Sequence, residues 1–216
     1  MQLGDGMLRT ALLFVSTLII ALPLGLVISF GRMSKWAPFG GKFKPVQLLS
    51  QLYISIMRGT PLMLQIMVVY FGPYYLFGIK ISASYQIYAA IIAFSINYAA
   101  YFAEIYRSGI ESMPVGQYEA AKILGFSKAQ TFFKIILPQV MKRILPSVTN
   151  EVITLVKDTS LAFVIAYAEM FTIAKRIAAK ETSMIPFVAA GIFYYIFNLI
   201  VALVMNRIEK KMSYYR

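Results

Sequence analysis

The sequence predicts an all-α membrane protein with five transmembrane helices. Aliphatic and aromatic residues make up 59% of its 216 positions and charged residues only 14%, whereas soluble domains have about 25% charged residues. Charged residues are absent from 10–30, 59–79, 81–103 and 182–206. Each of these stretches reaches about 20 residues, the length that a helix needs to cross a bilayer. A fifth stretch, 148–173, is long enough but contains charged residues.

The predicted spans place the two termini on opposite sides of the membrane. We expect spans at 8–31, 48–77, 81–106, 148–173 and 182–206 of a single transmembrane domain, 1–216. The segment 31–46 is basic and has no acidic residue, so the positive-inside rule places it in the cytoplasm. The N-terminus is then outside and the basic C-terminal tail, which ends in Arg216, is inside. Three basic residues oppose the rule, because they fall in the last outer loop: Lys175, Arg176 and Lys180.

Composition excludes several other kinds of protein. The net charge of +12 is spread over the gaps between apolar stretches, so a nucleic-acid-binding face is not expected. The chain has no Cys and no His, which excludes disulfides, thiolate or imidazole metal sites and a Ser-His-Asp triad. The first span is too long for the apolar core of a signal peptide and no small-residue cleavage site follows it, so we expect it to be retained.

Charged residues of the fourth predicted span lie on one side of a helix. Glu151, Thr154 and Asp158 recur at i, i+3 and i+7, and Glu169 returns close to the same face eleven residues after Asp158. Such a helix cannot face lipid all round, and ionisable groups inside a membrane are functional candidates. Asp158 lies about ten residues, or roughly 15 Å, from the predicted cytoplasmic end and therefore near the bilayer midplane.

Two hydroxyl residues, Thr159 and Ser160, follow Asp158 directly. Their side chains compete for backbone hydrogen bonds and favour a local irregularity of the helix. Transporters bind substrates at interruptions of this kind near the midplane. We therefore predict that Asp158, Thr159 and Ser160 contact a substrate.

Polar residues of the second and third predicted spans extend this candidate site. Asn97, Tyr101 and Glu104 recur at i, i+4 and i+7 on one face of the third span. On the second span Gln65 follows Thr60-Pro61, where the proline frees a backbone carbonyl. Asn97, Tyr101, Glu104 and Gln65 are therefore further candidates for substrate binding.

The charged residues of the inner half of the spans also allow a structural interpretation. Four of them could pair with one another and hold the helices together instead of lining a pathway: Arg58, Glu104, Glu151 and Lys157. With Asp158 and Glu169 included, acidic groups exceed basic groups by two, four against two. An electronegative cavity favours a cationic side chain.

The stretch 109–147 between the third and fourth spans is too polar to be a span. Residues 117–124 are good helix formers, and Gly125 suits the position after a helix end, where left-handed backbone is common. Ser127 with Gln130 three residues later predicts a capping box that opens a second helix. Two short cytoplasmic helices joined at a fixed corner are expected.

Three motifs carry a resemblance to one family of membrane proteins. Glu119-Ala120-Ala121, Gly125 and Ile135-Ile136-Leu137-Pro138 resemble the cytoplasmic EAA loop of ABC-importer permease subunits. Residues 58–62, with the sequence RGTPL, and 157–161, with the sequence KDTSL, look like the polar amino acid branch of that family. A five-span permease of this size is typical of the branch, so the resemblance covers nearly the whole chain.

The resemblance implies the type I ABC-importer fold and a set of partners. Two permease subunits, either two copies of one chain or a paralogous pair, would form the pathway in a prokaryotic cytoplasmic membrane. Two separate subunits would bind ATP and Mg²⁺, so this chain would hold no cofactor and would not be an enzyme. A soluble extracytoplasmic protein would deliver a polar amino acid. Five residues would dock in a cleft of the ATP-binding subunit: Glu119, Ala120, Ala121, Leu124 and Gly125.

Two other classes of function compete with this interpretation. An ion-coupled secondary carrier or a channel would use Asp158 for a cation, but it leaves the pattern of the loop unexplained. An intramembrane enzyme would need a His or a paired-carboxylate site. We therefore expect the membrane subunit of an ATP-driven amino acid importer, and the excess of acidic groups favours arginine, lysine or histidine, with glutamine or another neutral polar amino acid next.

Overall fold

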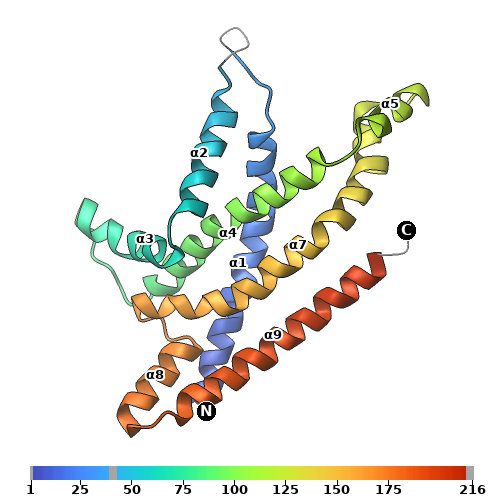
Figure 1. Cartoon of the computed structure of the whole chain (residues 1–216). Helices are drawn as coiled ribbons and strands as arrows, with labels where there is room; N and C mark the ends of the chain where they lie inside the picture. The colour runs from blue at the N-terminus through green and yellow to red at the C-terminus, as the bar shows by residue number, and fades with distance from the viewer. Residues whose placement is uncertain (1, 39–42, 213–216) are drawn as a thin grey trace.

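The computed structural model describes residues 2–38 and 43–212, and this part of the chain is helical throughout its regular structure (Figure 1). The elements in chain order are α1 (Gln2–Arg32), α2 (Pro45–Gly59), α3 (Leu62–Phe77), α4 (Tyr85–Glu111), α5 (Val115–Ile123), α6 (Lys128–Gln130), η1 (Thr131–Ile136), α7 (Leu137–Asp158), η2 (Thr159–Ile165), α8 (Met170–Glu181) and α9 (Ile185–Met212). The middle of the predicted basic segment 31–46 and the end of the tail, Arg216 included, lie outside the described residues.

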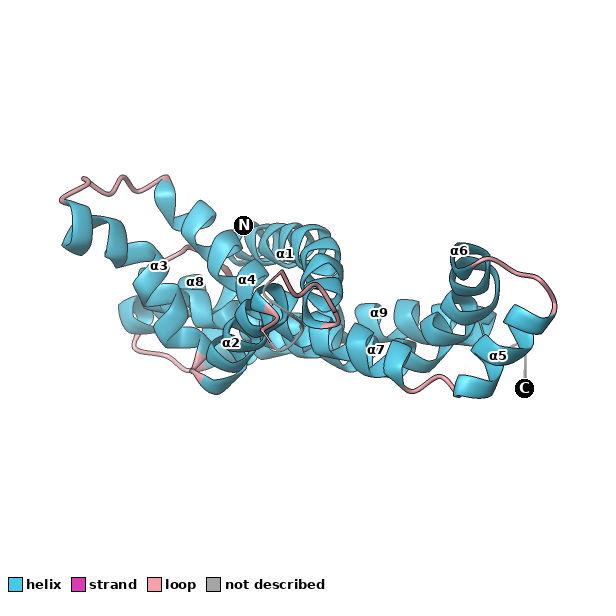
Figure 2. Ribbon diagram, turned by 90° about the horizontal axis from the view of Figure 1, so that it is seen from above, coloured by secondary structure: helices cyan, strands magenta, loops and turns pink. Residues whose placement is uncertain are grey.

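The molecule has two distinct ends. The end of α1 and the start of α2 lie at one end, and the start of α1 lies beside α8 at the other (Figure 1). In the view from above, α5 and α6 project from the body of the molecule, far from α3 and α8 (Figure 2). The predicted cytoplasmic corner and the predicted outer loop are thus at opposite ends of the fold.

Three described helices are long and apolar enough to cross a membrane: α1, α4 and α9. The pair α2 and α3 passes the same test as one bent span. α7 does not pass, because charged and polar side chains occupy too much of its length. The predicted count of five spans is therefore not reached by length and composition alone.

The second predicted span, 48–77, is not one continuous helix. The prediction of a single helix there was wrong. α2 ends at Gly59, α3 begins at Leu62, and the two axes differ by 108°. Pro61 has no N–H to donate, and its ring disfavours helical backbone at the residue before it. Thr60 accordingly has extended backbone, with φ −121° and ψ 148°.

The fourth predicted span, 148–173, is also broken. α7 ends at Asp158, a 3₁₀ helix continues to Ile165, and Ala166 turns the chain with a left-handed φ of 56°. The expected irregularity at Thr159 and Ser160 is confirmed, but the expected return of Glu169 to the face of Asp158 was wrong. Glu169 instead precedes the first residue of α8.

The predicted corner within 109–147 forms as its local sequence indicates. Gly125 has φ 78°, and the N–H groups of Gly125 and Phe126 donate to Lys122 O and Ala121 O at 3.0 Å each. These two bonds make a Schellman motif, which pairs the last carbonyls of α5. Ser127 and Gln130 form the predicted capping box.

The second helix of the corner is long rather than short, because helical backbone continues from α6 through η1 into α7. η1 is a π-helical segment, in which Leu137 N donates to Phe132 O. Such bulges accommodate a proline that cannot donate to the preceding turn, and Pro138 follows immediately. The predicted boundary at residue 147 therefore does not exist, and helical backbone joins the corner to Asp158.

α1 and α4 form the centre of the bundle. Small residues recur on α4 and are fully buried there: Ala89, Ala90, Ala93, Ala99, Ala100 and Ala103. Gly25 of α1 lies against this surface, where a Cβ atom would clash with Phe102 and the Ala99 carbonyl. Small residues let helix backbones approach closely in membranes, where packing contributes more than hydrophobic exclusion.

Glu169 joins α8 to α9 and is fully buried. Its carboxylate accepts from Phe171 N at 2.6 Å, from Thr172 N at 2.7 Å and from the Thr172 hydroxyl at 2.7 Å, which caps the first turn of α8. The hydroxyl of Tyr194 in α9 donates to the same carboxylate at 2.9 Å. Nearby, Thr10 of α1 accepts from Met170 N at 3.1 Å.

Replacing Glu169 should destabilise this end of the fold. In Glu169→Ala, buried donors of α8 and α9 lose their acceptor, which costs on the order of 2–4 kcal/mol when a cap and a buried partner are lost together. We expect a clearly lower thermal unfolding midpoint of the detergent-solubilised protein. Glu181→Ala, at the exposed far end of α8, is the matched control and should change the midpoint little; equal midpoints for both variants would contradict the role of Glu169.

Candidate functional site

The predicted acid lies where two helices meet. Asp158 is the last residue of α7 and is half-buried against α4. The hydroxyl of Tyr98, which is 2% exposed, donates to Asp158 Oδ2 at 2.7 Å. No ion pair to Asp158 is present among the residues that the structure describes. The carboxylate is thus oriented by a neutral phenol and keeps its charge available for a cation.

A basic group lies on the other side of the same aromatic pair. The guanidinium of Arg58, at the end of α2, lies 5.3 Å from the centre of the Tyr101 ring, which is cation–π geometry. The rings of Tyr101 and Tyr98 are neighbours, 6.1 Å apart between centroids. The acid of α7 and the base of α2 are therefore connected through two tyrosines of α4.

Gln65 and Asn97 come together at the break between α2 and α3. Asn97 Nδ2 donates to Gln65 Oε1 at 2.9 Å and to Met57 O at 3.0 Å. Gln65 Nε2 donates to Met57 O at 2.9 Å and to the Thr60 hydroxyl at 2.8 Å. The two amides pair the carbonyls that α2 leaves free where it stops before Pro61, so their described contacts are to the chain itself.

Thr159 and Ser160 also bond to backbone. Thr159 is fully buried and donates to Val156 O at 2.6 Å, while Ser160 donates to Lys157 O at 2.7 Å. Both bonds satisfy carbonyls where α7 gives way to η2. Ser160 is partly exposed, so of these two neighbours of Asp158 only Ser160 is accessible to a substrate.

Glu104 belongs to an ion cluster at the end of α4. Arg107 Nη2 lies 2.6 Å from its carboxylate, and Arg32 of α1 lies 3.9 Å from it. The described ion pairs do not join Arg58, Glu151 and Lys157 to one another or to Glu104. The structural interpretation thus holds for Glu104 with different partners from those expected.

Tyr98 is the site residue that the sequence analysis did not single out, and the stacking of Arg58 on Tyr101 was not predicted. Tyr98 lies three residues before Tyr101 and so on a neighbouring part of the α4 surface, which is the signal that could have found it. Among the described residues, no group of three or more His, Cys, Asp or Glu side chains is arranged to hold a metal ion.

The corner of α5 and α6 exposes apolar side chains at its tip. Ile123 is 86% and Leu124 is 73% exposed, while Glu119, Ala120 and Gly125 are also exposed. Ala121, only 1% exposed, packs inside the corner. Exposed apolar clusters of this kind mark interaction surfaces.

A groove runs behind the corner, between α5, α7 and the end of α9. Its volume is about 1220 Å³, and Gln117, Pro138, Arg143 and Met212 are among the residues that line it. Gln117 and Gln139 exchange hydrogen bonds of 2.8 and 2.6 Å across it, which holds α5 to the start of α7.

Comparison with known proteins decides the family. Residues 37–214 match the family model described as binding-protein-dependent transport system inner membrane component. The chain belongs to this family. It is an ABC transporter permease of the amino acid type, as the similar proteins below indicate, and a multi-pass membrane protein.

Similar permeases carry different amino acids. The permease is 36% identical to the arginine transport system permease protein ArtQ of Bacillus subtilis, with 97% of this chain and 91% of that protein covered. It is 34% identical to the L-cystine transport system permease protein TcyB of the same organism, with 99% and 87% covered. It is 32% identical to a putative glutamine transport system permease protein of Rickettsia bellii, with 96% and 91% covered.

Solved structures confirm the fold of the permease. An amino acid ABC transporter with histidines matches with a TM-score of 0.85 and 31% identity, over 97% of this chain and 94% of that one. An inward-facing methionine ABC transporter matches with a TM-score of 0.75 at 17% identity, over 98% and 96%, which shows the fold alone.

Asn97 should be required for the shape of the site. Asn97→Leu leaves Gln65 Oε1 without its donor and removes one of the two donors to Met57 O, and an acceptor left unpaired inside the protein costs about 1–3 kcal/mol. We expect a lower unfolding midpoint and reduced substrate binding. Ser95→Ala is the matched control, because Ser95 is buried on the same helix and its hydroxyl has no hydrogen-bond partner; a midpoint as low in the control would contradict the assignment.

Proposed function

We propose that the permease imports polar amino acids, with a preference for cationic ones, and that Asp158 receives the positive charge of the substrate. The observation that carries this proposal is the Asp158 carboxylate itself, half-buried between α4 and α7, oriented by Tyr98 and without an ion pair in the described structure. An unpaired carboxylate at such a site is costly unless a cation binds there. Arginine and lysine supply that cation twice, in the side chain and in the ammonium group, and histidine does so when its imidazole is protonated.

The opposite charge of an amino acid has a complementary group as well. Arg58 lies over Tyr101 and has no ion-pair partner among the described residues. A guanidinium binds a carboxylate with two parallel hydrogen bonds. We infer that the substrate lies along Tyr98 and Tyr101, with its carboxylate toward Arg58 and its cation toward Asp158.

Coupling to ATP is proposed to act through the corner. Leu124, Glu119, Ala120 and Gly125 present the exposed surface that would dock on a separate ATP-binding subunit, which holds ATP and Mg²⁺. Ala121 supports that surface from inside. Because helical backbone continues from Lys128 to Asp158, a movement of the corner would displace the substrate acid directly.

The full assembly would contain two permease subunits, either identical or paralogous, with two ATP-binding subunits and an extracytoplasmic binding protein. A prokaryotic cytoplasmic membrane would hold it. The corner would face the cytoplasm, and the α8 end would face outward. The N-terminus at the α8 end of the molecule supports this orientation (Figure 1).

Asp158→Asn should lower transport of arginine by about tenfold or more, which corresponds to the loss of roughly 1.4 kcal/mol at the binding step. Uptake is measured in proteoliposomes that contain the permease with its ATP-binding subunit and are supplied with the extracytoplasmic binding protein. Asp5→Asn, an exposed carboxylate at the start of α1, is the matched control and should transport normally. Glutamine uptake distinguishes two arrangements: an equal loss places Asp158 at the ammonium group, and a smaller loss places it at the side chain.

The same assay can overturn the proposal. Wild-type uptake by the Asp158→Asn variant would remove Asp158 from the pathway. Uptake that continues without ATP would favour an ion-coupled carrier instead of an ATP-driven importer.

Gly125→Asp should separate ATP hydrolysis from transport or release the ATP-binding subunit. A Cβ atom at Gly125 would meet open space, so the new side chain protrudes from the corner, but the left-handed φ of 78° strains any L residue there and the control must share that backbone conformation. Co-purification with the ATP-binding subunit and the ATP cost per transported molecule are the measurements. Gly78→Asp is the control, because Gly78 follows α3 with a left-handed φ of 66° and equally open space; a fully coupled Gly125→Asp complex would contradict docking at this corner.

A further inference from the structure

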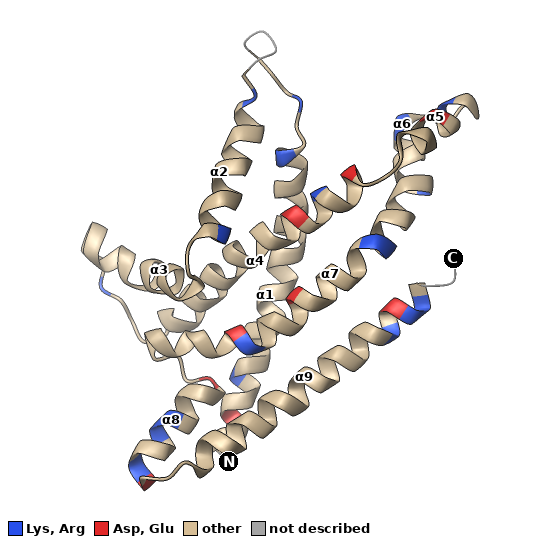
Figure 3. Ribbon diagram, viewed as in Figure 1, with Lys and Arg blue, Asp and Glu red and all other residues tan. Residues whose placement is uncertain are grey.

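α8 has a basic face at the end of the molecule opposite to the corner. Lys175, Arg176 and Lys180 are exposed on this twelve-residue helix. Figure 3 shows Lys and Arg on α8, far from α5 and α6. If the corner is cytoplasmic, these charges are on the outer side, where membrane insertion disfavours Lys and Arg. Three of them on one short helix therefore call for a functional reason.

The basic face is held rigidly. The opposite side of α8 is packed into the protein through Met170, Ala174 and Ala178, which are buried. Glu169 caps its first turn, and Thr10 of α1 accepts a hydrogen bond from its first N–H. A basic surface with a fixed geometry suits a specific partner, because little side-chain and backbone order has to be gained on binding.

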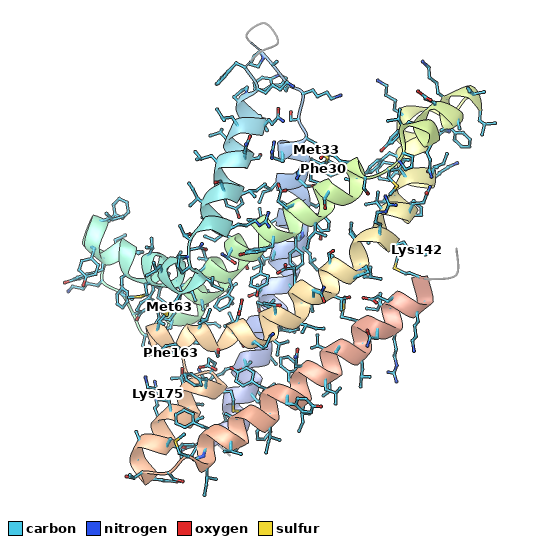
Figure 4. All side chains as sticks on the ribbon, viewed as in Figure 1. Phe30, Met33, Met63, Lys142, Phe163 and Lys175 are labelled. Carbon is cyan, nitrogen blue, oxygen red and sulfur yellow. The ribbon has the colours of Figure 1, made fainter. Side chains whose placement is uncertain are left out.

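Two of the basic side chains contact the segment that follows Asp158. The ammonium group of Lys175 lies 5.2 Å from the centre of the Phe163 ring (Figure 4). Arg176 Nη2 donates to Ala166 O at 3.3 Å. Phe163 belongs to η2, and Ala166 is the left-handed residue that ends it. A partner that draws these cations outward would therefore act on η2.

We propose that α8 is the docking surface for an acidic edge of the extracytoplasmic binding protein, with Lys175, Arg176 and Lys180 as its cationic contacts. This rests on the proposed function as an importer and on its orientation. Carboxylates of the partner would compete with Ala166 O for Arg176 and with the Phe163 ring for Lys175. Releasing the end of η2 would let the segment after Asp158 move when the loaded partner arrives.

The surroundings of α8 favour a protein partner over a lipid headgroup. The apolar side of the helix is covered by the chain itself, so α8 does not insert that side into a bilayer as an interfacial helix does. A recess of about 430 Å³ beside Lys175, lined also by Thr182, Ser183 and Phe187, offers a position for a protruding side chain. Opposite charges across an interface accelerate encounter and exclude wrong partners.

The probe is the purified soluble binding protein, chosen because it stimulates ATP hydrolysis by the wild-type complex. The test measures the affinity of this protein for the wild-type and variant complexes. Wild-type and Lys175→Glu/Arg176→Glu/Lys180→Glu complexes are reconstituted in nanodiscs of zwitterionic lipid and in nanodiscs containing phosphatidylglycerol. We expect the triple variant to bind at least tenfold more weakly in both lipids and to lose the salt dependence of wild-type binding. Because the substitutions also remove the contacts of Lys175 and Arg176 with η2, ATP hydrolysis without the binding protein should not fall below the wild-type rate.

Single charge reversals provide the matched comparison. Lys180→Glu should weaken binding severalfold, whereas Lys80→Glu, also exposed and in the other predicted outer loop, should stay within twofold of wild type. Binding of the triple variant at wild-type strength would overturn the proposal. A defect that appears only with phosphatidylglycerol would overturn it in favour of a lipid contact.

Failure of the proposal is distinguishable from failure of the proposed function. If no binding protein stimulates the wild-type complex and Asp158→Asn transports normally, the importer assignment itself is wrong. If stimulation is present and the triple variant retains it with unchanged affinity, only the docking surface is wrong.

Discussion

A helix that breaks inside a membrane must pair the backbone groups that it exposes, because lipid supplies no hydrogen bonds. Two predicted spans of this permease break in this way. At the first break, the side-chain amides of Gln65 and Asn97 both donate to Met57 O, and Gln65 also donates to the Thr60 hydroxyl. At the second break, the hydroxyls of Thr159 and Ser160 donate to two of the last carbonyls of α7, and the Glu169 carboxylate accepts from the N–H groups at the start of α8. These five polar residues of the spans serve this one requirement.

That requirement separates residues that maintain the site from residues that are free to act in it. Asn97, Gln65 and Thr159 are occupied by backbone contacts within the chain. Asp158 and Arg58 are not consumed in ion pairs within the described structure, and each rests against a tyrosine of α4. The breaks thus place an acid and a base at the ends of an aromatic surface, which is the charge pattern of an amino acid.

The breaks also determine how movement could reach that surface. Helical backbone is continuous from the start of α6 to Asp158, so a displacement at the corner could be passed along it. Beyond Asp158 the seven-residue 3₁₀ segment η2 is unusually long for its type, and the basic side chains of α8 contact its far end. Asp158 therefore lies between the continuous helix that leads from the corner and the 3₁₀ segment η2.

The sequence by itself determined the features that depend on composition or on neighbours a few residues apart. Uncharged stretches predicted membrane helices, Gly125 and the Ser127–Gln130 pair predicted the corner, and Thr159-Ser160 predicted the irregularity after Asp158. These signals are readable because a helix end is paired by residues within one turn of it. The three quoted motifs also indicated the permease family.

Only the tertiary structure decided which polar residues meet. Gln65 and Asn97 are 32 positions apart, and Tyr98 and Asp158 are 60 positions apart. Residue periodicity describes one helix at a time, so it assigned Asn97 and Gln65 to a ligand and placed Glu169 on the face of Asp158. The 108° bend and the packing of α4 against α7 set the actual partners. A carbonyl that is freed at a break accepts from a donor on a neighbouring helix, and only the packing decides which donor that is.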